Sequence, residues 1–282
     1  MRFLSMSISL LTLVFTSCES DLITSNAQED LKMAQEIETE RFISPINTLY
    51  KDCKFLYEGK TYEYTATIVN DSVVNINNDA AKAVLSELEN ASNTVTYLHL
   101  DGTIELFQNQ EVFYSKLPQI IKDDEEILNN EIVPYQADVP WETVPPIDKS
   151  NNKIANLYLC DDNNFCDTYH QFNLKSGEKV LEVRELKSVG LNDKVTSFAA
   201  YTIGGTTFFE LYEDSDFKDS CISFTVYQRE ATAWSGDIIF KWRPPANQYG
   251  QLLVADLKDI FVRGHKVDTW NDRISSVRIT RK

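Results

Sequence analysis

The chain has 282 residues, of which 43% are hydrophobic, and it carries a formal net charge of −16 at neutral pH. This length allows two modest domains, and the apolar content is sufficient for a buried core. The acidic balance argues against nucleic acid as a partner and makes cations the natural ones.

The first residues have the pattern of an export signal. Residues 1–17 contain one early positive charge and an apolar run that is too short to span a bilayer. The following sequence, Phe15-Thr16-Ser17-Cys18, resembles a bacterial lipobox, which is cut before the cysteine and lipidated on it. The acidic residues 19–21 resemble the surface-display signal in lipoproteins of Bacteroidetes-like bacteria. We expect lipid on Cys18 to hold the exported chain at the outer membrane or cell surface. An ordinary secretory signal is the alternative.

The rest of the chain divides at changes in composition. Residues 18–47 are predicted to form a polar tether and a helix. Residues 48–123 show strand and helix patterns in the order ββαββα, which predicts a small α+β domain. Residues 124–152 are acidic and rich in proline, which predicts an extended linker. Residues 153–282 are predicted to form an all-β domain with an insertion near 225–250.

Local signals in the α+β domain predict its elements. Two hairpins, in residues 53–78 and 94–107, flank a helix over residues 80–89. Asp79 is the expected N-cap of this helix. Its apolar face is predicted to be Ala81, Val84, Leu85 and Leu88. A second helix is expected over residues 111–122.

The all-β domain contains an internal repeat. Residues 159–172 match residues 211–224 at a constant offset of 52 residues. Each copy is followed by a hexapeptide with an amide, a carboxylate, two spacers, a hydroxyl and a serine, at residues 192–197 and 271–276. The hexapeptides are offset by 79 residues, so the second copy carries an insertion of 27 residues before its hexapeptide. Amide, carboxylate, hydroxyl and carbonyl oxygens are the ligands that Ca²⁺ prefers.

The repeat resembles the βγ-crystallin family. The Greek-key motif of that family has two aromatics separated by four residues, then a glycine, and later the clamp N/D-N/D-x-x-S/T-S. Both hexapeptides match the clamp at every constrained position. Cys160 stands at the first aromatic position, and Asp167 and Asp219 replace the glycine, whose positive φ Asp tolerates better than most residues. These departures weaken the corner but leave the clamps intact.

The resemblance implies a Greek-key sandwich with two calcium ions between interlocked clamps. The third residue of each clamp supplies a carbonyl and the fifth a hydroxyl to one ion, while the second supplies a carboxylate to the other. Carbonyls after the first aromatic positions complete the sets. The predicted ligands are Asp161, Asp193, Lys194, Thr196, Glu213, Asp272, Arg273 and Ser275. With one carboxylate per ion, we expect Kd values of about 10⁻⁵ to 10⁻³ M. The alternative is a pair of turns that have lost the ion.

The cysteines other than Cys18 are candidates for disulfides, because export predicts an oxidising compartment. Cys160 and Cys166 bracket one turn of the first repeat, so a local disulfide is the first expectation. Cys53 and Cys221 would then pair and tie the two domains together. Buried free thiols are the alternative.

The sequence contains no pattern typical of catalysis. Its three histidines are not in metalloprotease spacing, and it has neither a GxSxG motif nor a phosphate-binding loop. We therefore expect a structural or binding module of the cell envelope rather than an enzyme, with an extracellular protein or a glycan as partner. The insertion, with Trp234, Trp242 and Tyr249, suggests an alternative: a crystallin-like protease inhibitor that uses this loop.

Overall fold

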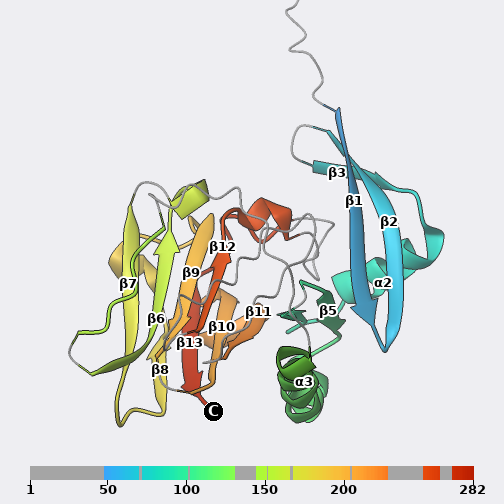
Figure 1. Cartoon of the computed structure of the whole chain (residues 1–282). Helices are drawn as coiled ribbons and strands as arrows, with labels where there is room; N and C mark the ends of the chain where they lie inside the picture. The colour runs from blue at the N-terminus through green and yellow to red at the C-terminus, as the bar shows by residue number, and fades with distance from the viewer. Residues whose placement is uncertain are drawn as a thin grey trace, which may run out of the picture. The chain divides into compact units, whose positions relative to one another are not determined.

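The structure of the protein is a computed structural model. It describes residues 48–69, 72–100, 102–130, 144–150, 152–165, 168–203, 205–227, 250–260 and 269–282. All of these belong to one compact unit, and they form thirteen strands in two sheets with two α-helices (Figure 1). Within these ranges, no helix combines the length and apolar character needed to cross a membrane. The predicted signal, Cys18 and the tether lie outside them.

The N-terminal part has the order βββαββα, with one strand more than the predicted ββαββα, and it begins with a long antiparallel hairpin. β1 (Thr48–Tyr57) pairs with β2 (Lys60–Val69), and β3 (Ser72–Ile76) pairs with the other edge of β2. Helix α2 (Asp79–Glu89) follows, with its apolar face buried as predicted: Ala81, Val84, Leu85 and Leu88. The predicted cap is wrong by one residue, because Asn78 accepts from the N–H groups of Ala80 and Ala81.

A second hairpin joins this part to the repeats. β4 (Val95–Leu98) and β5 (Ile104–Phe107) pair with each other, β5 also pairs in parallel with β1, and β4 pairs in parallel with β11 (Lys218–Val226). The result is a nine-stranded sheet in the order β3-β2-β1-β5-β4-β11-β10-β13-β8. Its last three strands are β10 (Thr207–Asp214), β13 (Ser276–Arg281) and β8 (Val180–Val183). The sheet is therefore continuous across the predicted domain boundary.

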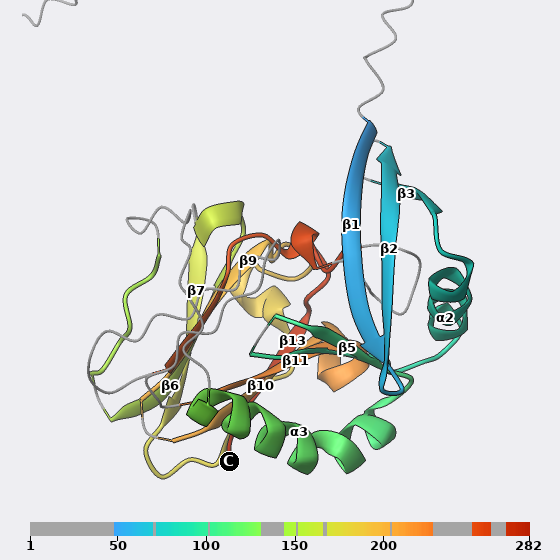
Figure 2. The same cartoon turned by 45° about the vertical axis from the view of Figure 1, so that its right-hand side comes forward.

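Helix α3 (Gln110–Asn130) is longer than predicted and includes residues 124–130, which the sequence placed in the linker. It lies along β5 and crosses the nine-stranded sheet (Figure 2). Phe113 of α3 packs against Phe107 of β5 and Phe208 of β10, with ring centroids 5.1 and 6.0 Å apart. Asp124 is only 1% exposed, so this acidic residue belongs to the packed helix and not to a solvated linker.

The two repeats contribute four strands each. The first has β6 (Lys153–Cys160), β7 (Tyr169–Lys175), β8 (Val180–Val183) and β9 (Ser197–Thr202). The second has β10 (Thr207–Asp214), β11, β12 (Gly250–Val254) and β13 (Ser276–Arg281). The third strand of each repeat is exchanged: β8 pairs with β13, and β12 pairs with β9 in the four-stranded sheet β12-β9-β6-β7. The sheet that contains most strands of one repeat thus also contains one strand of the other repeat.

Aromatic rings fill the space between the two sheets. Phe224 of β11 stacks on Phe198 of β9, in the opposite sheet, with centroids 4.9 Å apart, and on Phe209 of its own sheet at 5.1 Å. All three side chains are fully buried. The same apolar cluster continues to the buried face of α2, so the N-terminal part and the repeats share one core.

The predicted disulfide between Cys53 and Cys221 is wrong, because both are free thiols. Cys53 is on β1 and Cys221 on β11, three strand positions apart in the sheet. Neighbouring strands are about 4.8 Å apart, so the spacing across the sheet alone separates these residues by at least about 14 Å, well beyond the reach of a disulfide. Burial raises the pKa of the Cys221 thiol. Cys160 is buried at the end of β6, whereas Cys166 lies outside the described residues, so their pairing stays a prediction.

A buried charged network lies at the junction of β4, β5, α3 and β11. The Nδ1 of His99 is 3.3 Å from Asp124 Oδ1, and its Nε2 is 3.0 Å from Glu105 Oε2. The hydroxyls of Tyr97 and Tyr227 donate to Asp124 Oδ2 at 3.0 and 3.2 Å. Burial lowers the pKa of His99, but its hydrogen bonds with Asp124 and Glu105 outweigh this and raise the pKa to about 9.

We expect the free energy of unfolding to fall as the pH rises through about 9. The folded-state pKa of His99 lies above its usual 6.5, so the stabilisation from charged His99 is complete below about 6.5 and lost through about 9. The loss should be on the order of 3 kcal/mol. Urea unfolding at several pH values tests this. His99→Gln should remove the alkaline decline, while His170→Gln on β7 should keep it; a decline that persists in His99→Gln contradicts the assignment.

Candidate metal centre

A buried serine anchors the first hexapeptide to the turn that follows β6. The Oγ of Ser197 donates to the carbonyl oxygen of Asp162 at 2.6 Å and accepts from the N–H of Phe165 at 3.2 Å. The Ser197 side chain is fully buried. This serine therefore satisfies two backbone groups of a tight turn that would otherwise lack partners.

The second repeat has the same anchor. The Oγ of Ser276 donates to the carbonyl of Asp214 at 2.6 Å and accepts from the N–H of Phe217 at 3.1 Å. Asp219, which was expected to replace a glycine of positive φ, has a φ of 60°. Its counterpart Asp167 lies outside the described residues. The corner of the second repeat thus keeps its geometry without glycine.

The two hexapeptides hold each other by crossed backbone hydrogen bonds. The N–H of Asp193 donates to the carbonyl of Ile274 at 3.2 Å, and the N–H of Asp272 donates to that of Val195 at 3.1 Å. Both aspartates have positive φ, 52° and 54°, and the side chains of Val195 and Ile274 are fully buried. Asp193 and Asp272, which are 79 positions apart in the sequence, therefore have the same backbone conformation and make the same contact with the opposite hexapeptide.

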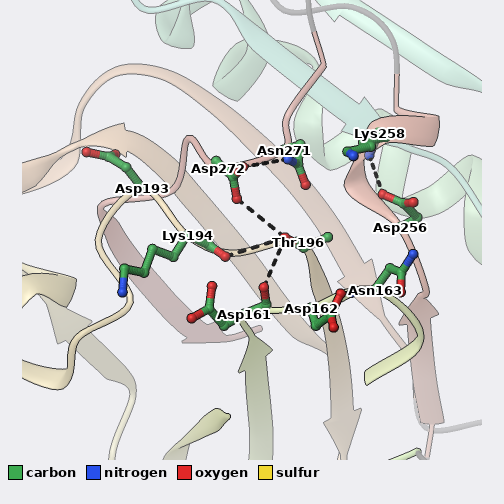
Figure 3. Close-up of a pocket in the computed structure, with 10 residues that line it drawn as sticks. All are labelled: Asp161, Asp162, Asn163, Asp193, Lys194, Thr196, Asp256, Lys258, Asn271 and Asp272. Carbon is green, nitrogen blue, oxygen red and sulfur yellow. Dashed lines mark hydrogen bonds between the residues drawn. The ribbon is translucent and has the colours of Figure 1, made fainter. Parts of the chain in front are cut away.

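Four of the predicted ligands come together at the first hexapeptide (Figure 3). The Oγ1 of Thr196 lies 3.3 Å from Asp161 O, 3.5 Å from Lys194 O and 3.4 Å from Asp272 Oδ1. All three distances are long for an O–H···O bond, and one hydroxyl proton can serve only one acceptor at a time. The acceptors at this point therefore outnumber the protons available to them.

These distances match neighbouring oxygens in the coordination shell of a cation. Two ligands that lie about 2.4 Å from Ca²⁺, at right angles to each other, are about 3.4 Å apart. One carboxylate, one hydroxyl and two carbonyls also form a ligand set that this ion accepts. The first site therefore has the spacing and the chemistry for Ca²⁺.

The four ligands line an acidic pocket with a volume of about 370 Å³. Asn271, the first residue of the second hexapeptide, donates from Nδ2 to Asp272 Oδ2 at 2.7 Å, which orients the carboxylate. The Oδ1 of Asn271 is buried and accepts no hydrogen bond from the described residues. A buried acceptor without a donor is destabilising, and a cation or its bound water would satisfy it.

The second site is built by the same crossing. The Oγ of Ser275 donates to Asp193 Oδ1 at 2.8 Å. The N–H of Ser275 donates to the carbonyl of Tyr212 at 2.8 Å, which places the serine near the end of β10, next to Glu213 of the same strand. Glu213 and Arg273 hold the sequence positions equivalent to the two carbonyl ligands of the first site. Here the hydroxyl makes one ordinary hydrogen bond to the carboxylate.

The orienting role of the two hexapeptide amides was missed in the sequence. Asn192 donates to Asp193 Oδ2 at 2.6 Å, as Asn271 does to Asp272. The signal was present, because an amide precedes the carboxylate in both copies. Among the described residues no three His, Cys, Asp or Glu side chains form a metal-holding group. The predicted sets contain one carboxylate each, so they would not form such a group.

Two predicted features lie outside the described residues. They are the lipidation site Cys18 and most of the insertion, with Trp234, Trp242 and Tyr249. The protease-inhibitor hypothesis depends on that insertion, so it stays a prediction.

A scan against protein-family models finds no match to the chain. Searches of curated proteins and of solved structures find none either. A function therefore has to be inferred from the residues of the chain itself.

We expect Ser276→Ala to destabilise the protein by about 1–3 kcal/mol, because it leaves a buried N–H and a carbonyl without partners. Ser197→Ala should have a similar effect. Chemical denaturation in the presence of a chelator measures this anchor without any contribution from a bound ion. Ser188→Ala, which removes an exposed serine, is the control. If Ser276→Ala loses no more stability than the control Ser188→Ala, the buried serine does not anchor the corner.

Proposed function

We propose that residues 153–282 form a calcium-binding domain of the βγ-crystallin type, with two ions held between the two crossed hexapeptides. The observation that carries this proposal is the cluster of three acceptor oxygens around the Thr196 hydroxyl, at 3.3 to 3.5 Å. An ion there would balance the carboxylate of Asp272 and replace hydrogen bonds that one proton cannot supply.

The arrangement of the strands supports the Greek-key part of this proposal. The internal repeat produces two four-stranded units that exchange their third strands. The serine anchors recur at equivalent positions with distances that differ by no more than 0.1 Å. Such repetition is expected when two copies of one motif pack pseudo-symmetrically.

The first ion would be held by Asp272, Thr196, Lys194 and Asp161, and the second by Asp193, Ser275, Arg273 and Glu213. Bound calcium would supply positive charge between two loops and tie them together. At a free calcium concentration of about 100 times Kd, each site would stabilise the folded chain by about 2.7 kcal/mol. The role is therefore structural, or that of a binding module with calcium-dependent rigidity.

The start of the chain and its charge fit an extracellular setting. A lipidated Cys18 would hold the protein at the outer membrane or cell surface, where calcium is more abundant than inside cells. Weak sites with one carboxylate each are suited to such calcium levels. We propose an extracellular protein or a glycan as the partner, and a binding role rather than an enzymatic one.

Calorimetric titration of the whole chain with calcium tests this function. We expect two binding events with Kd values of about 10⁻⁵ to 10⁻³ M, and a higher melting temperature in calcium than in chelator. The double variant Asp193→Ala with Asp272→Ala should lose both the heat and the shift.

The matched control is Asp162→Asn, which removes another carboxylate of the same pocket that is not a predicted ligand. It should weaken binding much less than Asp272→Asn does. An equal loss from the two variants would mean that general negative charge attracts calcium without a built site. No heat and no shift in the unaltered chain would refute the proposed function.

A further inference from the structure

Trp270 connects the second hexapeptide with the N-terminal part of the protein. It directly precedes that hexapeptide, and its side chain is fully buried. Its indole Nε1 donates to the Oγ1 of Thr96 at 3.3 Å. Thr96 is on β4, the strand that joins the N-terminal part to the repeats. A side chain next to the candidate metal centre therefore contacts the junction directly.

The first hexapeptide lacks an equivalent donor. The offset of 79 residues places Leu191 at the position of Trp270, and Leu191 is also buried in the core. Leucine has no polar group, so it can form only apolar contacts. The pseudo-symmetry of the two sites is broken at this position. The residue before the second hexapeptide, Trp270, makes a polar contact with β4, whereas Leu191, before the first hexapeptide, cannot.

The junction that Trp270 contacts depends on directional bonds between hydroxyl groups. β4 pairs with β11 over only four residues. Thr94 Oγ1 lies 2.7 Å from Ser220 Oγ, and Thr225 Oγ1 lies 3.0 Å from the hydroxyl oxygen of Tyr97. These side chains are buried, so a shift that breaks their bonds leaves unsatisfied polar groups. The pairing of β4 with β11 is therefore sensitive to small displacements.

The residues that would hold the ions follow Trp270 closely. Asp272 serves one proposed site, and Arg273 and Ser275 serve the other. Calcium would fix the backbone of the hexapeptide, and with it the position of the indole. We propose that calcium binding strengthens the pairing of β4 with β11 through Trp270, so that calcium controls how firmly the N-terminal part is attached to the repeats. This inference rests on the calcium binding proposed above.

The test is hydrogen–deuterium exchange of the whole chain, with calorimetry on the same samples. The amides of β4 report local opening of the junction. In saturating calcium they should exchange roughly 5-fold or more slowly than in chelator. Trp270→Phe keeps a buried ring and removes the donor, so it should abolish this difference. Coupling between sites is reciprocal, so calcium should bind more weakly to Trp270→Phe than to the unaltered chain, by up to the same factor.

Two further variants complete the test. Thr96→Val removes the acceptor and should behave as Trp270→Phe does, which keeps the inference testable if the tryptophan variant does not fold. Thr202→Val is the control, because it removes a buried hydroxyl that contacts Thr207 at 2.7 Å within the repeats. The control should retain the calcium effect on β4.

The outcomes separate the inference from the function on which it rests. Calcium binding without any change in β4 exchange would overturn the inference and leave the proposed function standing. A calcium effect that persists in Trp270→Phe and in Thr96→Val would overturn the route through the indole. The absence of calcium binding by the unaltered chain would overturn both.

Discussion

The crossed hydrogen bonds between the two hexapeptides are the constraint on which the candidate metal centre depends. Each aspartate N–H donates to the opposite loop, and each aspartate carboxylate reaches a hydroxyl of that loop. Neither loop can therefore take its position until both repeats have folded. A site made in this way forms only in the native state, so any ion that it binds stabilises folding directly.

Two kinds of contact hold the two parts of the chain together. The apolar core is continuous from α2 to the stacked rings of Phe198, Phe209 and Phe224, and such contacts tolerate small shifts. The seam between β4 and β11 consists of hydroxyl pairs and the charged network around His99, which require defined distances. The apolar core spans both parts, whereas the polar seam makes the join sensitive to the charge of His99, Glu105 and Asp124.

The sequence predicted what depends on local patterns. The buried face of α2 follows from a helical period, and the equivalence of the hexapeptides follows from matching residues. The order of the strands was not predictable, because β4 meets β11 across a separation of 126 residues, as the Thr94–Ser220 contact shows. The error in pairing Cys53 with Cys221 has the same cause. Asp124 was assigned to a linker because its neighbours are acidic, and the tyrosines that bury it are distant in the sequence.

The parallel pairing of β4 with β11 has a consequence for solubility. Without the N-terminal part, β11 would be an edge strand with a row of unpaired backbone N–H and C=O groups next to a row of apolar side chains. Exposed edges of this kind recruit strands from other molecules and lead to aggregation or strand swapping. The β4–β5 hairpin covers this edge within the same chain. The N-terminal half therefore protects the repeats from self-association, whatever else it binds.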